Sequence, residues 1–265
     1  MRPDLAFEEC MLKRQVDLGF PSASVLENNM QADDGWNVRF MRIGHAGAAA
    51  HAPANSLKSL ALALELGMDM VEFDVRPCRD ALVLLHDDDL SHISNRPGLV
   101  SQQTLDELRK IDLGGGERIA TLAEAVDLIK DRALMNVDLK AEGIESDVVE
   151  LLERKDVLGD ALISSLRPDS LKRVRQRAPT ARMGISYPED RAHVFGRAYL
   201  KPAVTFALWI IKMSLPYRIL RLIASAQANG TMLNRKVVSR ATVRKVHEAR
   251  GRVFVWTVED RKSVV

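Results

Sequence analysis

The sequence has little of several features that would assign it to a common class of proteins. Two cysteines, Cys10 and Cys78, are too few for a disulfide framework, and their scarcity fits a reducing compartment. A formal net charge of +2 predicts neither a nucleic-acid binder nor an acidic tail. No apolar run approaches the roughly 18 residues that span a bilayer, and the N-terminus lacks the apolar core of a signal peptide. We therefore expect a cytoplasmic protein that does not bind nucleic acid.

What the chain does have is the material for a substantial core. Its 265 residues are 46% hydrophobic and 28% charged, which suits one large α/β domain or two small ones. No glycine-rich dinucleotide or phosphate-loop fingerprint occurs, which counts against an open sheet that binds nucleotides.

From residue 40 onward, short apolar strands alternate with helical segments. Seven strands are expected, beginning at Phe40, Val71, Leu134, Ala161, Arg182, Thr231 and Arg252. Capping-box spacing at Thr104 and Thr121, and Ser239 further on, mark helix starts between them. Strands separated by helices predict a parallel sheet with right-handed crossovers. Because the chemically reactive residues fall at the C-terminal ends of different strands, we expect an α/β fold of the TIM (β/α)8 barrel type.

Two carboxylates share one face of the second strand. Side chains alternate along a strand, so Glu72 and Asp74 leave the backbone on the same side, about 7 Å apart. Between the apolar residues of this strand they would repel each other in a core unless a cation lay between them. Hard oxygen ligands of this kind suit Mg²⁺ or Ca²⁺.

The segment after this strand predicts a hairpin. The turn from Arg76 to Asp80 is too short for a parallel crossover, so the chain must fold back. This return places His86 opposite Phe73 and Asp74, beside the predicted metal site. The alternative is an edge hairpin that simply bears surface charges.

Three further residues join this group if the strands close into a barrel. His45 follows the first strand, while Asp138 and Lys140 share a face of the strand that begins near residue 133. The two histidines could then remove and donate protons, and the lysine could hold an anion. A cation, a lysine and an acid–base pair are what displacement at a phosphoryl centre needs.

The order of these motifs resembles that of the glycerophosphodiester phosphodiesterases, a family of metal-dependent TIM-barrel enzymes. That family carries His-Arg-Gly, Pro-Glu-Asn-Thr, Glu-x-Asp, His-Asp, carboxylate-x-Lys and Trp-Thr-Val motifs. The corresponding motifs here are His45-Ala46-Gly47, Pro53-Ala54-Asn55-Ser56, Glu72-Phe73-Asp74, His86-Asp87, Asp138-Leu139-Lys140 and Trp256-Thr257-Val258. The resemblance covers roughly residues 40–260, and six motifs in one order argue against coincidence.

The resemblance implies a role for each of the candidate site residues. It implies that one divalent cation, Mg²⁺ or Ca²⁺, is bound by Glu72, Asp74 and Asp138. The implied general acid–base pair is His45 and His86. Lys140 is implied as the phosphate ligand, and Trp256 as a wall of the alcohol pocket. The implied reaction is hydrolysis of a glycerophosphodiester to glycerol 3-phosphate and an alcohol.

Two motif positions depart from the family pattern. Ala46 stands where the family has an arginine, so the bidentate contact of that side chain with phosphate is lost. Ala54 stands where the family has a glutamate. Arg42, Arg76 and Arg79 lie nearby in the sequence, but the sequence does not show that any of them substitutes.

Three functions therefore stay open. The first is the glycerophosphodiester phosphodiesterase reaction. The second is a lysophospholipase D-like or sphingomyelinase D-like phosphodiesterase, with an apolar segment near residues 199–226 holding an acyl chain. The third is a catalytically impaired barrel that binds a phosphodiester or a partner after the loss of the arginine and the glutamate.

Two segments lie outside the strand–helix pattern. Residues 1–39 form an N-terminal extension ahead of a barrel domain at 40–265. Its helix Leu5–Leu18 and strand Ala23–Leu26 could supply an eighth strand by permutation; the alternative is a truncated chain with a loose N-terminal arm.

The second segment is an apolar helical insertion near residues 199–226. Pro216 predicts that it splits into two short helices. Trp209, with basic residues such as Arg218, could place it on a membrane surface or over the barrel mouth. Packing against the barrel or a second subunit is the simpler interpretation.

Three polar residues near the predicted mouth receive no firm role. His51 and His92 lie in polar loops and are interpreted as solvated. Asp87 either belongs to a solvated loop or orients a histidine.

Overall fold

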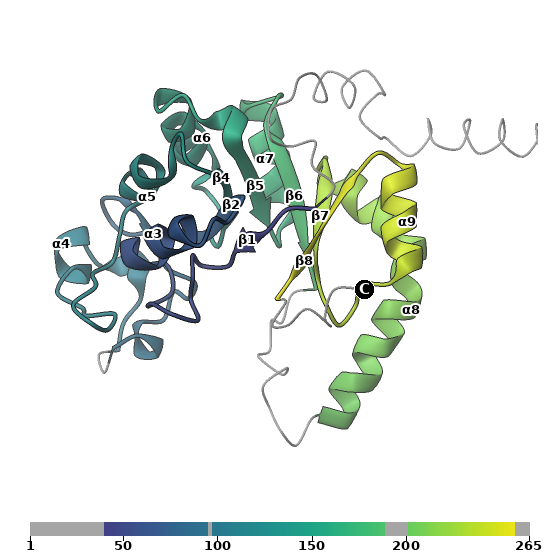
Figure 1. The fold of residues 1–265 in the computed structure, drawn as a ribbon, viewed down its shortest axis with the longest axis horizontal. Coiled ribbons are helices and arrows are strands. Elements are labelled where there is room, and N and C mark those ends of the chain that lie inside the picture. Colours follow the sequence, from purple (N-terminus) through teal and green to yellow (C-terminus); the bar gives the residue numbers. More distant parts are fainter. Residues whose placement is uncertain (1–39, 95–96, 189–200, 258–265) are drawn as a thin grey trace, which may run out of the picture. The chain divides into compact units, whose positions relative to one another are not determined.

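A computed structural model of the chain describes residues 40–94, 97–188 and 201–257 (Figure 1). The chain divides into two compact units, with a boundary between Met183 and Gly184. The predicted helix Leu5–Leu18 and strand Ala23–Leu26 lie outside the described residues. Their place beside the first strand, and the division into an extension and a barrel domain, therefore stay predictions.

The first unit is built on parallel strands. Its strands pair in the order β1 (Ile43–Gly44), β2 (Met70–Pro77), β4 (Leu134–Leu139) and β5 (Ala161–Ser165), and β3 (Leu82–Leu84) returns antiparallel to the end of β2. Side chains of β2, β4 and β5 are almost all buried, as expected for strands that are covered on both faces. The predicted parallel sheet is confirmed for these strands.

Helices connect these strands as crossovers. They are α3 (Leu57–Glu65), α4 (Leu105–Leu108), α5 (Leu122–Ile129), α6 (Glu145–Arg154) and α7 (Pro168–Arg177), with 3₁₀ turns at Leu90–His92, Val100–Gln102 and Leu158–Asp160. Thr104 and Thr121 each form the predicted capping box with the glutamate three residues later. Helix α3 packs against α5, and α6 against α7.

The second unit continues the alternation of strands and helices. Strands β6 (Arg182–Tyr187), whose first two residues precede the boundary, β7 (Gly230–Asn234) and β8 (Arg252–Trp256) are parallel and pair in that order, with helices α8 (Lys201–Ser225) and α9 (Arg240–Glu248) between them. Ser239 caps α9, as predicted, by accepting a hydrogen bond from the backbone of Thr242. All seven predicted strands are thus present in the described part of the chain.

The first strand is shorter than predicted. It was expected from Phe40, but β1 holds only Ile43 and Gly44. The backbone N–H of Arg42 donates to a carboxylate oxygen of Asp69 at 2.8 Å instead of to a neighbouring strand. The Arg42 carbonyl still accepts the backbone N–H groups of Asp69 and Met70, at 3.0 and 3.2 Å, so a side chain replaces only the donor half of the ladder at this end.

The prediction that Pro216 splits the apolar insertion is wrong. Helix α8 runs unbroken from Lys201 to Ser225 with Pro216 inside it. Leu215 and Ile219, on either side of the proline, are buried, and α8 packs against α9. This packing offsets the backbone hydrogen bond that proline removes.

The hairpin after β2 has the predicted register. Val75 pairs with Leu84, and the N–H of Leu85 donates to the carbonyl of Asp74 at 3.1 Å. The ladder ends at Leu84, and His86 follows two residues later in the chain. The fold-back thus brings the imidazole to the strand that bears the carboxylates.

The loop after β1 is held in an unusual backbone conformation. Ala46 and Gly47 both have positive φ, at 47° and 79°, a region that L-residues seldom adopt. The N–H of Gly47 donates to the carbonyl of Glu72 at 3.0 Å, and the hydroxyl of Ser59 donates to the carbonyl of Ala46 at 2.8 Å. A Cβ on Gly47 would lie 2.5 Å from the backbone of Ser59. Only glycine fits between this loop and α3.

A buried carboxylate joins α6 to α7. Glu145 accepts hydrogen bonds from the backbone of Gly143 at 2.8 Å, from the Ser170 hydroxyl at 2.6 Å and from the Arg173 Nε at 3.0 Å. Burial acts to raise the pKa of Glu145, but the Ser170 hydrogen bond and Arg173 hold it below its ordinary value. The ionised carboxylate is therefore part of the helix packing.

Replacing Gly47 by alanine should destabilise the protein by about 2–4 kcal/mol, because strained φ and a steric clash combine. Gly143→Ala is the matched control. Its φ is also positive, at 86°, but nothing lies within 4 Å of the added Cβ, so we expect a loss of about 1 kcal/mol. Urea unfolding measures the free energy of unfolding of both variants. Equal losses of stability would show that the steric clash with Ser59 does not contribute.

Replacing Glu145 by glutamine should lower the free energy of unfolding at pH 7 by about 1–3 kcal/mol, because charge-assisted hydrogen bonds weaken. Since the folded-state pKa of Glu145 is depressed, its stabilisation is present above its ordinary value of 4.5 and is lost as pH falls through the folded-state pKa. The difference between wild type and variant should therefore shrink in acid. Glu150→Gln, on the exposed face of α6, should change stability by less than about 0.5 kcal/mol. A difference that is the same at pH 7 and pH 3 contradicts the assignment.

Candidate metal centre and acid–base site

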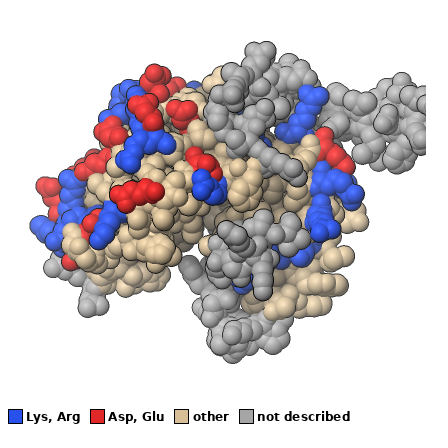
Figure 2. Space-filling view, viewed as in Figure 1, with Lys and Arg blue, Asp and Glu red and all other residues tan. Residues whose placement is uncertain are grey.

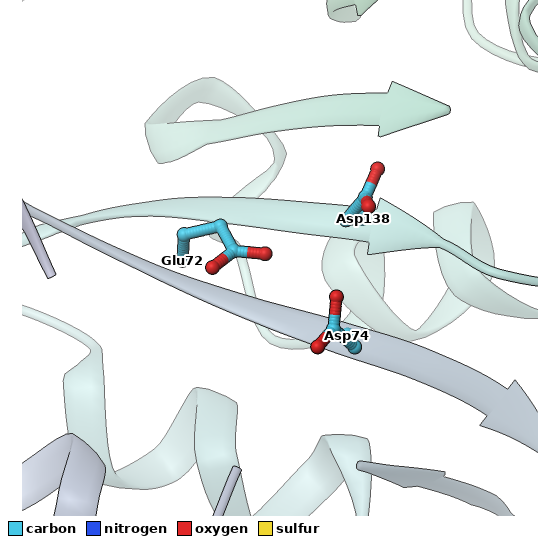
Figure 3. Close-up of side chains that lie close together, drawn as sticks. All are labelled: Glu72, Asp74 and Asp138. Atoms are coloured by element: carbon cyan, nitrogen blue, oxygen red, sulfur yellow. The ribbon is translucent and has the colours of Figure 1, made fainter. Parts of the chain in front are cut away.

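Three carboxylates converge from two neighbouring strands (Figure 3). Glu72 and Asp74 come from β2 and Asp138 from β4, with 5%, 2% and 7% of their surfaces exposed. Parallel pairing sets Asp74 directly opposite Asp138, and one oxygen of each group lies within 4.8 Å of the others. The predicted acidic cluster thus forms, and it does so because the strands are in register.

Lys140 lies against this cluster. Its Nζ is 2.5 Å from an oxygen of Asp138 and 3.0 Å from Oδ1 of Asp74. Burial acts to lower the pKa of Lys140, but the charges of Asp138 and Asp74 hold it above its usual range. The ammonium therefore stays charged and offsets part of the acidic charge.

Two neutral side chains orient the aspartates. The Asn55 side-chain amide donates to Oδ2 of Asp74 at 2.8 Å and accepts from the Asp74 backbone N–H at 3.0 Å. The Ser164 hydroxyl donates to Asp138 at 2.7 Å, from the position on β5 that pairs with it. Neither residue is assigned a role from the sequence alone. Asn55 lies within one of the motifs and so was recognisable, whereas no pattern marks Ser164.

The donor set fits a hard divalent cation. Oδ1 of Asp74 is buried and, among the described residues, makes no aligned hydrogen bond, although Lys140 approaches it. Burial and the charge of Asp74 raise the pKa of Glu72. Burial also acts to raise the pKa of Asp74, but Lys140 and His86 hold it below its usual value. Three close carboxylates with only one ammonium between them leave negative charge that a metal ion could balance.

His45 is fixed by the same cluster. Its Nδ1 lies 2.7 Å from Oε2 of Glu72, which also accepts the Ala46 backbone N–H at 2.7 Å. An ionised carboxylate only accepts hydrogen bonds, so Nδ1 carries the proton and Nε2 is left for proton exchange. The hydrogen bond with Glu72 raises the pKa of His45 against the effect of burial.

His86 is oriented by its neighbour in the chain. Its Nδ1 lies 2.8 Å from Oδ1 of Asp87, whose other oxygen lies 2.8 Å from Nδ1 of His92. Asp87 therefore orients a histidine, one of the two alternatives from the sequence. His92 is exposed, as expected, but it also pairs with Asp87, a contact that its polar loop did not reveal.

The other candidate residues lie in different parts of the chain. Trp256 ends β8 in the second unit, so its role at the alcohol pocket stays a prediction. Arg42 pairs with Asp69 before the start of β2, and Arg79 is exposed in the hairpin turn. Arg76 does reach the site, where its Nε donates to the carbonyl of His86 at 2.8 Å.

Comparison with known proteins gives a consistent picture. The sequence profile of the glycerophosphoryl diester phosphodiesterase family matches residues 45–265. The glycerophosphodiester phosphodiesterase of Caldanaerobacter subterraneus subsp. tengcongensis is 33% identical over 164 residues, which are 57% of this chain and 68% of that protein. Probable glycerophosphodiester phosphodiesterase 2 of Mycobacterium tuberculosis is 30% identical over 237 residues, or 84% of this chain and 83% of that one.

Solved structures share the fold. A phosphodiesterase from Oleispira antarctica, in complex with the product sn-glycerol-3-phosphate, has a TM-score of 0.65 and 25% identity over 83% of this chain and 85% of its own. The glycerophosphodiester phosphodiesterase of Thermotoga maritima has a TM-score of 0.65 and 21% identity over 86% of this chain and 90% of its own. These similarities confirm the predicted α/β fold of the TIM-barrel type. The chain belongs to the glycerophosphoryl diester phosphodiesterase family and, with it, to the phosphoric diester hydrolases.

Proposed function

We propose that this protein hydrolyses glycerophosphodiesters to glycerol 3-phosphate and an alcohol with the help of one divalent cation, Mg²⁺ or Ca²⁺. The observation that carries the proposal is the buried cluster of Glu72, Asp74 and Asp138, flanked by two histidines whose Nδ1 atoms are each held by a carboxylate. The product complex of the relative from Oleispira antarctica supports the substrate class.

The two histidines divide the proton transfers. Hydrolysis adds water across a P–O bond, so one proton must leave the attacking oxygen and one must reach the departing alcohol. Because His45 and His86 both bind carboxylates through Nδ1, each presents Nε2 for this exchange. One acts as the general base and the other as the general acid.

The phosphoryl group would be bound by the cation and by an ammonium. Glu72, Asp74 and Asp138 are the proposed metal ligands, and the cation would supply Lewis-acid stabilisation of charge on the phosphoryl oxygens. Lys140 remains protonated beside the carboxylates, and its ammonium is the proposed phosphate ligand. Asn55 and Ser164 keep Asp74 and Asp138 in place through their hydrogen bonds.

Purified protein should release glycerol 3-phosphate from glycerophosphocholine, and EDTA should abolish the release until Mg²⁺ or Ca²⁺ is restored. His45→Ala and His86→Ala should each lower kcat by about 100-fold or more, because a general acid or base is lost. His247→Ala is the control, since this histidine is exposed on α9 and should leave the rate unchanged. Turnover of neither glycerophosphocholine nor lysophosphatidylcholine by the metal-loaded protein would favour the non-catalytic binding alternative.

A lysophospholipid phosphodiester is the second candidate substrate, because α8 exposes an apolar stripe. Large side chains recur on one face of this helix at Phe206, Trp209, Ile210, Met213 and Tyr217, each at least 46% exposed. The rings of Phe206 and Trp209 stack with centroids 5.9 Å apart. The opposite face, which includes Leu208 and Ile219, is buried. Faster turnover of lysophosphatidylcholine than of glycerophosphocholine would favour this candidate.

The same stripe is the proposed contact with a membrane surface. Helix α8 contains Lys201, Lys212, Arg218 and Arg221 and no acidic residue, and its visible part is tan and blue without red in Figure 2. Aromatic side chains with flanking basic groups suit the interface of an anionic bilayer. No helix in the described residues is long and apolar enough to cross a membrane. The cytoplasmic location stays a prediction.

Vesicles containing anionic lipid should sediment with the wild-type protein, and Trp209→Glu should weaken this binding by about tenfold or more, because apolar burial is lost and a repulsive charge is added. Leu66→Glu is the matched control, since Leu66 is 49% exposed but lies outside the stripe. Equal sedimentation of both variants and the wild type removes the membrane interpretation.

A further inference from the structure

The β2–β3 hairpin carries a guanidinium that the metal and acid–base roles leave unused. Arg76 follows Glu72 and Asp74 at alternate positions of β2, so all three side chains leave the strand on the same side. Its Nε donates to the backbone carbonyl of His86 at 2.8 Å. This bond holds the guanidinium beside a proposed acid–base residue.

Arg76 has donor groups left over. Within residues 40–94, 97–188 and 201–257, its two terminal NH₂ groups make no hydrogen bond, and no carboxylate forms an ion pair with it. The side chain is half-buried. Burial lowers the pKa of Arg76 while Asp88 and Asp87 act to raise it, and an arginine stays protonated at neutral pH. A half-buried cation with free N–H groups lacks the partners that burial normally requires.

A second guanidinium approaches from the loop between β5 and α7. Arg167 donates from Nη1 to the carbonyl of Lys140 at 3.0 Å, and its Nε lies 3.3 Å from Oε1 of Glu142. Burial lowers the pKa of Arg76, and the like charge of Arg167 acts in the same direction. Two like charges repel each other, and an anion between them would reduce that repulsion.

We propose that Arg76, assisted by Arg167, binds the unesterified oxygens of the substrate's phosphoryl group. A guanidinium fork matches two oxygens of a phosphodiester in a bidentate arrangement, which an ammonium cannot do. Because the two guanidiniums donate to the backbone carbonyls of His86 and Lys140, an anion held by both would lie at the residues that carry the imidazole and the ammonium. This inference rests on the proposed function.

The local charges support this assignment. Lys140 and one divalent cation would together balance the three carboxylates, which would leave the single negative charge of a phosphodiester without a counter-charge in that group. Arg76 supplies one. Ala46, the residue after His45, contributes only its backbone N–H to Glu72 and offers no side-chain cation to the substrate.

The test measures product binding apart from turnover. Isothermal titration with glycerol 3-phosphate and with inorganic phosphate gives Kd, and hydrolysis of glycerophosphocholine gives KM and kcat. Arg76→Gln should raise Kd and KM about tenfold or more, and Arg167→Gln should raise them by less. Arg76→Lys, which keeps the charge but loses the fork, should fall between wild type and Arg76→Gln. Arg79→Gln, at an exposed arginine of the same hairpin, should match the wild type within about twofold.

The outcomes separate this inference from the proposed function. A purely structural role of Arg76 would lower Tm and kcat while leaving the Kd for glycerol 3-phosphate unchanged. A Kd in Arg76→Gln within twofold of wild type therefore overturns the inference, even if wild-type hydrolysis establishes the function. Wild-type protein that neither hydrolyses glycerophosphocholine nor binds glycerol 3-phosphate overturns both.

Discussion

Three buried carboxylates repel one another, and the other residues of the site reduce this repulsion. Charges removed from water are tolerated in a protein only when other groups pair with them or a metal binds them. Neighbouring segments contribute such groups. They are the Lys140 ammonium, the His45 imidazole, the Asn55 amide, the Ser164 hydroxyl and the Ala46 backbone N–H. These groups hold the carboxylates apart in a fixed geometry. They do not cancel the whole charge, which is what keeps the cluster suited to a divalent cation.

The register of the strands brings the side chains of the site together. Asp74 and Asp138 face each other because β2 and β4 pair residue by residue, and Ser164 faces Asp138 because β5 continues the same register. A shift of one residue would send all of these side chains to the opposite face of the sheet. The hairpin places Arg76 by the same rule, since its antiparallel ladder pairs Arg76 with Val83, and His86 follows two residues after the last paired position, Leu84. The apolar packing that fixes the strands therefore also fixes the chemistry.

The sequence predicts those parts of the site that follow from periodicity. Alternation along β2 places Glu72 and Asp74 on one face, and a short turn returns His86 to them, so both were predictable. Ser164 was not, because a serine in an apolar strand acquires meaning only when the neighbouring strand sets an aspartate opposite it. His92 lay in a polar loop, and its contact with Asp87 depends on a 3₁₀ turn that brings the two together. The unbroken α8 was missed because packing on α9 outweighed the local preference of proline.

The alanine after His45 separates two tasks that an arginine at this position would combine. Backbone geometry performs the first task, since the Ala46 N–H binds Glu72 in a loop fixed by Gly47 and Ser59. That contact needs no particular side chain, so the orientation of Glu72 and His45 survives the alanine. The second task, binding the phosphoryl oxygens, would fall to the side-chain guanidinium, which alanine lacks. The alanine therefore leaves the proposed metal ligands in place, and the guanidinium that we propose for the second task is that of Arg76, which β2 holds at the backbone carbonyl of His86.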